Sequence, residues 1–470
     1  MNRRDFVKKT SVATVASIFS TSVASAIAKM PKGRKMKVVL VGTGIRGTGM
    51  WGKNLVDNYS DYLEFVALCD INPGRLEYAK EYMGVNCKTY LAEDFDKMIS
   101  EQTPDSIIVT TMDSNHDQYI TRAMELGVNV ISEKPMTTDE VKCQNILDTE
   151  KKTGKNLTVT FNYRYGPYMT KVKQLLQEER VGKITSVDFH WYLNPYHGAS
   201  YFRRWHGEKD KGGTLLVHKS THHFDLLNWW LNSDPAEVFA YGDLEHYGAN
   251  NPFRGEKCRG CAHIEQCGGY YWDITKDERS MKLYVENEKY DGYIRDNCLW
   301  RKEIDIYDKM AVQIKYANNV QVSYSLTTYS PYEGYRVSFN GTKGRIDAWE
   351  GIPFNNGDNL DQSKLHSAEM DQGNDSLKRE PIIVMDNFNK EYETIWVEIE
   401  RGGHGGGDGR LLDKIFVDPA AADPYKHSAG SRDGSFSILI GIAARKSIEE
   451  NRPVKVESLT SLKPHPTRES

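Results

Sequence analysis

The chain has 470 residues, with 61 Lys and Arg against 65 Asp and Glu, for a formal net charge of −4. At about 150 residues per domain, this length predicts two or three domains. A composition of 39% hydrophobic and 27% charged residues is typical of a globular protein. The charge balance gives no basis for nucleic-acid binding, and no apolar run reaches the roughly 18 residues needed to cross a bilayer. An enzyme or a small-molecule-binding protein remains.

Residues 1–28 have the layout of an export signal. Arg3 and Arg4 precede Phe6, a mildly apolar stretch follows, and Ala24-Ser25-Ala26 has A-x-A spacing. Such a pattern is typical of a removable signal peptide, and the arginine pair resembles the twin-arginine type, which exports folded proteins. We therefore expect a periplasmic protein.

A glycine motif, G-x-G-x-x-G, follows a short apolar strand predicted over residues 36–41. In this motif Gly42 permits a tight turn, Gly44 lets the backbone approach a pyrophosphate, and Gly47 allows close packing of helix on strand. The N–H groups at the start of the following helix then face the phosphates. The expected cofactor-binding residues of this loop are Gly42, Gly44, Ile45, Arg46 and Gly47.

A second strand, predicted over residues 63–69, ends at Asp70, which lies 70 − 47 = 23 residues beyond the last glycine. A carboxylate at this position accepts hydrogen bonds from a ribose 2′-hydroxyl and repels a 2′-phosphate. NAD is therefore preferred over NADP as the cofactor. Arg75 keeps NADP open, because an arginine can accommodate the extra phosphate.

Helices predicted over 75–83 and 117–126 alternate with strands over 106–111 and 129–132. This rhythm predicts an α/β fold with a doubly wound parallel sheet, a Rossmann domain, over residues 36–155. Ligands of such sheets bind beyond the carboxyl ends of the strands. The candidates at two such ends are Thr111, Asn115, His116, Glu133 and Lys134.

Glu133-Lys134-Pro135, the glycine motif, Asn115-His116 and the segment 158–167 together resemble the glucose–fructose oxidoreductase / inositol dehydrogenase (Gfo/Idh/MocA) family. The resemblance implies that a second α/β domain follows, over residues 156–460. This domain would carry a large open, mostly antiparallel sheet that binds substrate and forms a homo-oligomer, a dimer or tetramer. A helix over 435–449 is expected to pack back on the Rossmann domain. Asn162 and Arg164 are expected at the cofactor and Tyr163 at the substrate.

The resemblance also implies that Lys134 contacts both the nicotinamide ribose and the substrate. A buried lysine with a lowered pKa can exchange a proton with a hydroxyl group. His222 matches the family histidine, whereas His218 stands where the family has an aspartate, with Lys219 beside it. Spacing of i, i+4 places His218 and His222 on one helix face. We expect Lys134, His218, Lys219 and His222 to be catalytic.

Four cysteines define an insertion over residues 250–300: Cys258, Cys261, Cys267 and Cys298. Their spacing suits a structural zinc site. An oxidising periplasm favours disulfides instead, and free thiols are a third alternative.

Three further residues are substrate candidates. Trp205 belongs to an aromatic group that could stack on a sugar ring, and His223 adjoins His222. His404 lies in the glycine run 402–407, which predicts a loop that either covers the active site with His404 and Asp408 or is merely flexible. Residues 351–395 are expected to form a long surface excursion.

These patterns, together with what the family resemblance implies about the substrate, predict an NAD(P)-dependent oxidoreductase that acts on a hydroxyl of a sugar or glycoside and holds its cofactor tightly. A tightly held cofactor follows from export, because free NAD is not expected outside the cytoplasm. One alternative is a glycoside hydrolase that uses NAD for transient oxidation and elimination. A non-catalytic sugar-binding protein is the other, motivated by the missing aspartate.

Overall fold

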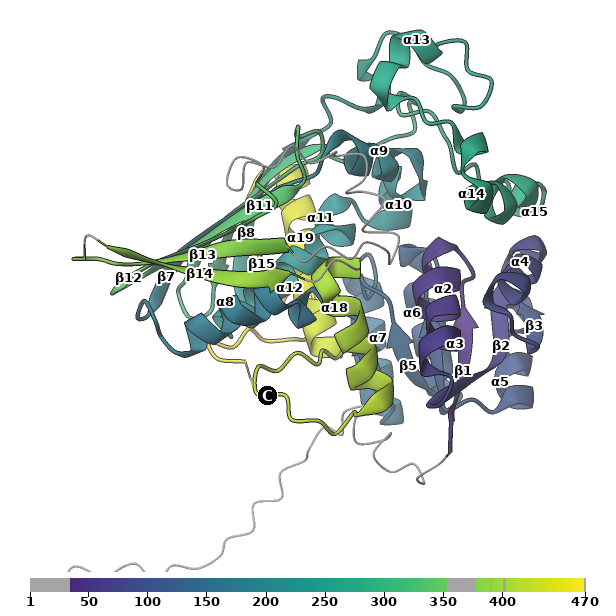
Figure 1. The fold of residues 1–470 in the computed structure, drawn as a ribbon, viewed down its shortest axis with the longest axis horizontal. Helices are drawn as coiled ribbons and strands as arrows, with labels where there is room; N and C mark the ends of the chain where they lie inside the picture. Colours follow the sequence, from purple (N-terminus) through teal and green to yellow (C-terminus); the bar gives the residue numbers. More distant parts are fainter. Residues whose placement is uncertain (1–33, 353–377, 390, 400–402, 469–470) are drawn as a thin grey trace, which may run out of the picture.

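A computed structural model describes residues 34–352, 378–389, 391–399 and 403–468. Two sheets divide these residues into an N-terminal and a C-terminal domain (Figure 1). The expected export signal, residues 1–28, lies outside the described part of the chain. Within that part, no helix combines the length and the apolar character that a membrane crossing requires.

The N-terminal domain is built on a parallel six-stranded sheet in the order β3-β2-β1-β4-β5-β6, which confirms the predicted Rossmann fold. Its strands are β1 (Met36–Val41), β2 (Leu63–Asp70), β3 (Lys88–Leu91), β4 (Ser106–Val109), β5 (Asn129–Ser132) and β6 (Leu157–Val159). Between them run α2 (Ile45–Thr48), α3 (Asn54–Tyr59), α4 (Pro73–Met83), α5 (Phe95–Gln102), α6 (His116–Glu125) and α7 (Glu140–Thr153). The central strands β1 and β4 are almost wholly buried, as expected where helices cover both faces of a parallel sheet.

The C-terminal domain carries a nine-stranded, mostly antiparallel sheet in the order β14-β13-β12-β11-β7-β10-β9-β8-β15, as expected. Its strands are β7 (Ile184–Tyr192), β8 (Pro235–Asp243), β9 (Lys309–Tyr316), β10 (Gln321–Thr327), β11 (Gly334–Gly341), β12 (Gly344–Glu350), β13 (Lys378–Asp386), β14 (Tyr392–Ile399) and β15 (Val454–Lys455). Exposed and buried residues alternate strictly along β9, so one face of the sheet is covered and the other is open.

The surface excursion expected over residues 351–395 is wrong for its described part. β13 and β14 form an antiparallel pair that extends the sheet at its edge, next to β12. Half-exposed edge strands carry many polar residues, so their composition does not distinguish them from a loop. Residues 353–377 lie outside the described part of the chain.

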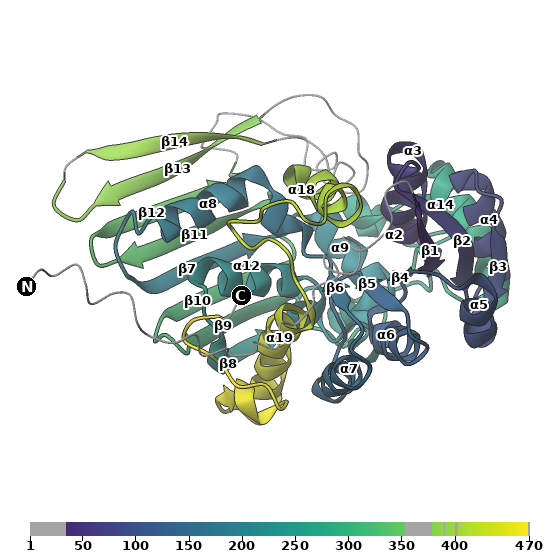
Figure 2. The ribbon, with the colours of Figure 1, turned by 90° about the horizontal axis from the view of Figure 1, so that it is seen from below.

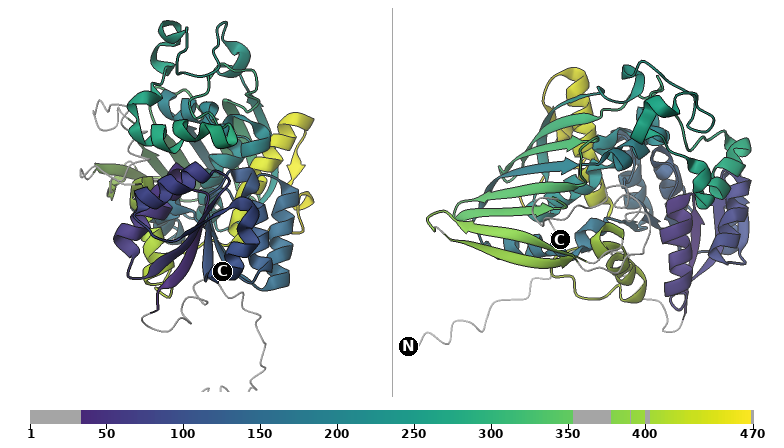
Figure 3. Two further views of the ribbon diagram at one scale, coloured as in Figure 1. Left: turned by 90° about the vertical axis from the view of Figure 1, so that its right-hand side faces the viewer. Right: turned by 45° about the horizontal axis from the view of Figure 1, so that its top comes forward.

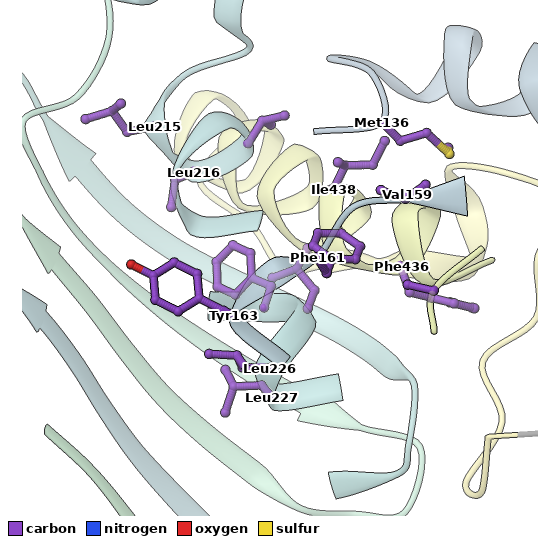
Figure 4. Packing of buried hydrophobic residues seen from close by; sticks show 14 of the residues in the cluster. Met136, Val159, Phe161, Tyr163, Leu215, Leu216, Leu226, Leu227, Phe436 and Ile438 are labelled. Carbon is purple, nitrogen blue, oxygen red and sulfur yellow. The ribbon is translucent and has the colours of Figure 1, made fainter. Parts of the chain in front are cut away.

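Helices α8 (Pro167–Gln177), α12 (Ser220–Leu231) and α19 (Ser431–Glu450) lie over the covered face (Figure 2). α19 packs back on the Rossmann domain, as expected. It contacts α7 and β6 of that domain, but it also packs on β8, α12 and the short helix α11 (Leu215–His218). Figure 4 shows Phe436 and Ile438 of α19 near Val159 and Met136. The helix therefore forms a shared core between the domains.

The insertion extends from the C-terminal domain across to the Rossmann domain (Figures 1 and 3). It contains α13 (Ile264–Cys267), α14 (Glu278–Leu283) and α15 (Glu288–Asp291), and α14 packs against α4. Its far end therefore lies beside the helix that follows Asp70.

The glycine run forms the start of a helix, α18 (Gly403–Leu412), and not the predicted loop. Gly405 and Gly406 have positive φ angles, and a Cβ on Gly407 would lie 2.2 Å from the carbonyl oxygen of Asn162. Glycine is used here because α18 packs closely against the turn Asn162–Tyr165, where a side chain has no room. The glycine content of this segment predicted a loop, but the glycines are required by close packing.

Candidate active site

One large cavity, of about 1020 Å³, lies where the two domains and the insertion meet. It opens at the carboxyl ends of β1, β2, β4 and β5, the edge at which ligands of parallel sheets bind. The predicted residues that line it are Gly42, Gly44, Ile45, Arg46, Asp70, Thr111, Asn115, His116, Glu133, Lys134, Asn162, Trp205, His218, Lys219 and His222. The site is thus assembled from segments far apart in the sequence.

The glycine loop has the close contacts that a dinucleotide cradle needs. Gly42 has φ +95°, and a Cβ there would lie 2.7 Å from the backbone of Thr110. A Cβ on Gly47 would lie 2.2 Å from the carbonyl oxygen of Gly42, so Gly47 serves packing and does not line the cavity. A Cβ on Gly44 would meet only the Tyr284 hydroxyl, at 3.5 Å. Gly44 therefore keeps its face of the cavity open, which fits the approach of a pyrophosphate.

Asp70 is held rigidly at the end of β2. Its carboxylate accepts hydrogen bonds from the N–H groups of Thr43 at 2.6 Å and Asn72 at 2.9 Å. Arg75 lies 3.2 Å from Asp70 and 2.5 Å from Asp291 of the insertion. The guanidinium is therefore neutralised by two carboxylates.

Lys134 follows β5 and points across the cavity to the second domain. Its Nζ donates to the carbonyl oxygen of His218 at 3.2 Å. Burial lowers the pKa of Lys134 to about 8; Asp113 and Glu133 oppose this shift, while the positive charge of Lys219 adds to it. A lysine in this environment can exchange a proton near neutral pH.

His218 occupies the position of the family aspartate, and the structure supplies a carboxylate from elsewhere. Asp113, in the loop after β4, lies with its Oδ2 2.5 Å from Nδ1 of His218. Burial lowers the pKa of His218 and raises that of Asp113, so burial disfavours the charged form of both groups. Sequence reasoning marked this strand end but did not single out Asp113. Only the tertiary structure brings the two residues together.

The helix expected to carry both histidines is divided into two. α11 ends at His218 and α12 begins at Ser220, yet His218 and His222 both line the cavity. The His222 ring meets the Tyr163 ring edge-on, with centroids 4.7 Å apart. The Nζ of Lys219 lies 5.8 Å from the centre of the same ring. Tyr163 therefore supports these two side chains from behind and does not line the cavity itself.

Besides Gly47 and Tyr163, two more predicted site residues lie outside the cavity lining. Arg164 is almost fully buried and pairs with Asp225 at 2.5 Å and Asp433 at 2.8 Å, so it joins helices and does not reach the cavity. His223 bonds to the Tyr324 hydroxyl at 2.7 Å and stacks on Trp191. Successive helical residues point about 100° apart, so His223 faces the sheet when His222 faces the cavity. The side chain of His404 lies outside the described part of the structure.

A polar network lies beneath the glycine loop. Arg46 pairs with Glu133 at 2.7 Å and with Asp408 at 3.2 Å, and Asn162 donates to Asp408 at 2.5 Å. The Nε1 of Trp51 donates to Glu133 at 2.7 Å. α18 therefore delivers Asp408 to the side of the cofactor loop.

Sequence reasoning missed three residues that line the cavity: His206 and Arg204 on the substrate side, and Tyr284 beside the glycine loop. His206 stacks on Trp205, with ring centroids 3.5 Å apart, and its ring centre lies 4.1 Å from that of His218. Arg204 and Tyr284 also line the cavity. The aromatic cluster around Trp205 was a signal for this region, but no sequence pattern indicated that Tyr284 crosses over from the insertion.

The four insertion cysteines line a second, small cavity of about 20 Å³. All four are free thiols. Within the described residues, no group of three or more His, Cys, Asp or Glu is placed to hold a metal ion. Moreover, Arg203 donates to the sulfur of Cys258 at 2.9 Å, which puts a positive charge where a zinc ligand was expected. The arrangement therefore does not fit the predicted zinc site, nor does it contain the alternative disulfides.

Fold and site define a two-domain oxidoreductase with a dinucleotide-binding Rossmann domain. Residues 11–161 match the model of the oxidoreductase family NAD-binding Rossmann fold, and residues 173–456 match that of the family's C-terminal alpha/beta domain. The chain belongs to the Gfo/Idh/MocA oxidoreductase family.

Three known proteins illustrate the similarity. "Putative oxidoreductase YteT" of Bacillus subtilis (strain 168) is 35% identical over 439 residues, covering 90% of this chain and 99% of that protein. Inositol 2-dehydrogenase/D-chiro-inositol 3-dehydrogenase of Lactiplantibacillus plantarum is 24% identical over 199 residues, covering 42% of this chain and 53% of that protein. The WlbA dehydrogenase of Bordetella pertussis, solved with NADH and UDP-GlcNAcA, aligns with TM-score 0.59 at 16% identity, covering 90% of this chain and 99% of the other.

Proposed function

We propose that this protein is an NAD-dependent oxidoreductase that acts on a hydroxyl group of a sugar or glycoside. The observation that carries the proposal is the position of Lys134. Its amine, with a pKa of about 8, lies in one cavity with the glycine loop on one side and Trp205 and the histidines on the other. The inositol dehydrogenase relative acts on a polyhydroxylated ring, which supports the substrate class.

The chain's own residues provide the proton chemistry and the orientation. The nicotinamide, when bound, accepts or donates the hydride. Neutral Lys134 takes the proton of the reacting hydroxyl, and the backbone carbonyl of His218 orients its amine. His222 and the His218–Asp113 pair offer acceptors for the same or the adjacent hydroxyl group. Trp205 provides an aromatic face against which a sugar ring can stack.

NAD is the proposed cofactor because Arg75 is already neutralised by Asp70 and Asp291. A 2′-phosphate would have to compete with both carboxylates for the guanidinium. Asp70 remains the acceptor suited to a ribose 2′-hydroxyl.

Contacts between the insertion and the cofactor loop support the proposal that the cofactor is held tightly. The Tyr284 hydroxyl accepts from the N–H of Ile45 at 2.9 Å, and Arg279 donates to the carbonyl oxygen of Ile45 at 3.1 Å. Asn72, beside Asp70, donates to the carbonyl oxygen of Asn287 at 3.0 Å. The insertion thus fastens to both ends of the expected dinucleotide groove, and a bound cofactor would leave only when these contacts open.

The test is to denature the purified protein with acid and identify the released nucleotides by mass spectrometry. We expect about one NAD per folded chain without added cofactor. A panel of sugars and glycosides should then yield a ketosugar with stoichiometric NADH formation under single-turnover conditions. Absence of any nicotinamide nucleotide, together with no binding of added NAD, would disprove the proposal.

A glycoside hydrolase with transient oxidation is the second candidate. It needs a base in addition to Lys134, and the His218–Asp113 pair offers one. Glycoside cleavage with neither ketosugar nor NADH accumulation would favour it. The third candidate is a non-catalytic sugar-binding protein, and the argument for it was the missing family aspartate. Asp113 supplies a carboxylate at that position, so this argument no longer applies.

Export to the periplasm and homo-oligomer formation through the open sheet face complete the proposal. The support for export is the Arg3-Arg4 signal, and the support for assembly is the uncovered face of the nine-stranded sheet. Fractionation of cells that express the full chain, with an Arg3→Lys/Arg4→Lys variant as control, tests export. Light scattering of the purified protein measures its oligomeric state.

A further inference from the structure

Arg204 is a guanidinium on the cavity wall whose charge lacks a carboxylate partner within the described residues. It follows α9 (Pro195–Arg203), and its Nε donates to the carbonyl oxygen of Ser200 at 3.0 Å. Its guanidinium carbon lies 5.2 Å from the centre of the Tyr201 ring. The charge of Arg204 also lowers the pKa of Asp113, but the carboxylate of Asp113 is already bonded to His218.

A second arginine, Arg295 of the insertion, increases the positive charge at this place. It is only 6% exposed, and its Nε and Nη1 atoms are buried and have no hydrogen-bond partner in the described part of the chain. Its guanidinium lies over the rings of Trp272 and Tyr284. Burial, together with the charge of Arg295, lowers the pKa of Arg204 to about 10. Arg295 is buried and Arg204 half-buried, and neither is paired with a carboxylate among the described residues, so the arrangement is suited to an anion that arrives from outside.

The cavity as a whole is positive although the chain is negative. Nine Arg and Lys residues line it against seven Asp and Glu, while the full sequence carries −4. Of these cations, Arg46 and Arg75 are paired with acids on the cofactor side. Lys211 and Arg301 are paired with Glu208, whereas Arg204 has no carboxylate partner within the described residues.

The arginine pair lies near the reaction centre. Burial is the main cause of the low pKa of His206, and Arg204 and Arg295 both add to it. Arg204 has the same effect on His218, whose carbonyl oxygen binds Lys134. The Tyr201 ring, beside Arg204, has its centre 5.4 Å from that of the His218 ring, so an anion on Arg204 would lie close to the histidines.

We propose that Arg204, supported by Arg295, binds a carboxylate of the substrate, so that the sugar is an acidic one: a uronic acid or a glycoside that contains a uronate. This inference deepens the proposed function, because it takes the cavity to be the sugar site of that oxidoreductase. Planar, charged guanidinium groups match carboxylates in geometry, and hydrogen bonds between ionised groups are strong. The pyrophosphate of the cofactor has related oxyanion chemistry, and the experiment distinguishes the two.

Binding of matched sugar pairs to the holoenzyme is the test. Calorimetry compares glucuronate with glucose and galacturonate with galactose, without turnover. We expect the uronate of at least one pair to bind about tenfold more tightly or better. Arg204→Met should reduce uronate binding by about 100-fold and neutral-sugar binding by less than about threefold, and Arg204→Lys should retain part of the preference. Arg122→Met, on the exposed face of α6, is the matched control.

Two outcomes would overturn the inference. Equal binding of acidic and neutral sugars by the wild type is one, and it needs no variant to fold. The other is an Arg204→Lys or Arg204→Met protein that loses NAD, measured as nucleotide per folded chain, while its uronate preference is unchanged; the arginine would then serve the pyrophosphate. Uronate binding without oxidation of any sugar would instead disprove the proposed function and leave the inference intact.

Discussion

At the scale of single residues, the pKa values of Lys134 and His218 depend on where the fold places these side chains. Lys134 lies among Asp113, Glu133, Lys219 and Arg46, and burial decides the balance in favour of a lower pKa. His218 is held neutral by burial, with Asp113 at 2.5 Å. Lys134 can therefore exchange a proton near neutral pH, whereas His218 stays in its neutral form, in which an imidazole nitrogen can accept a hydrogen bond.

The pH dependence of oxidation should report on Lys134. Only the neutral amine accepts a proton, so kcat/KM should rise about tenfold per pH unit below 8 and level off above it. Lys134→Arg keeps the positive charge at all pH values, and it should lower kcat by about 10²–10⁴-fold and abolish the rise near pH 8. Steady-state kinetics over pH 6–10 measure this. Lys53→Arg is the control, because Lys53 lies on the surface just before α3. If the pH profile of Lys134→Arg kept its inflection near pH 8, that inflection would belong to another group.

At the scale of elements, the glycine loop and the insertion form the cofactor groove together. Gly42 and Gly47 are required by packing, because a Cβ on either would overlap backbone atoms. Gly44 differs from both: its φ of −72° suits any residue, and only the cavity lies beside it. Its glycine therefore serves the ligand and not the fold.

Gly44→Ala should consequently separate folding from cofactor binding. The new Cβ would be 3.5 Å from its nearest neighbour, an ordinary contact, so the melting temperature of the nucleotide-free protein should stay within a few degrees. The cofactor content or affinity should fall by about tenfold or more, because the methyl group occupies the place where the backbone approaches the pyrophosphate. Gly269→Ala, whose Cβ would meet nothing within 4 Å among the described residues, is the control. Full cofactor retention by Gly44→Ala would place the dinucleotide elsewhere.

At the scale of the whole molecule, buried ion pairs join the helices that frame the site. Arg164 follows the last Rossmann strand and bonds to Asp225 of α12 and Asp433 of α19. The helix that carries His222 is thereby tied to the helix shared by both domains. We infer that Arg164 maintains the relative position of the domains and acts on catalysis only through that position.

Arg164→Met should therefore destabilise the fold without removing the cofactor from molecules that remain folded. Loss of the guanidinium leaves Asp225 buried without its partner, which typically costs about 3–5 kcal/mol. Urea unfolding followed by fluorescence measures the change in the free energy of unfolding. Arg180→Met, an exposed partner of Asp386 and Glu393, should cost less than about 1 kcal/mol. A stable Arg164→Met protein without nucleotide would restore the role first predicted for this residue.

The sequence by itself determined the Rossmann fold, the glycine loop with Asp70, and Lys134 as a candidate catalytic residue. Each of these features depends on local backbone geometry or on a position at the end of a strand, and both can be recognised from a short segment of sequence. The sequence did not predict α18, because its glycines are required by close packing and not by a flexible loop. It also did not predict where the side chains of Arg164 and His223 point, because that depends on their partners in other elements.

Only the tertiary structure decided which charges meet. Asp113 reaches His218 across 105 positions of sequence, and Tyr284 reaches Ile45 across 239. Burial then sets the pKa of each group, and burial is a property of the assembled cavity. Electrostatic interactions act through space and not along the chain. The charges and pKa values of this site therefore depend on how the two domains and the insertion come together, which the sequence alone does not show.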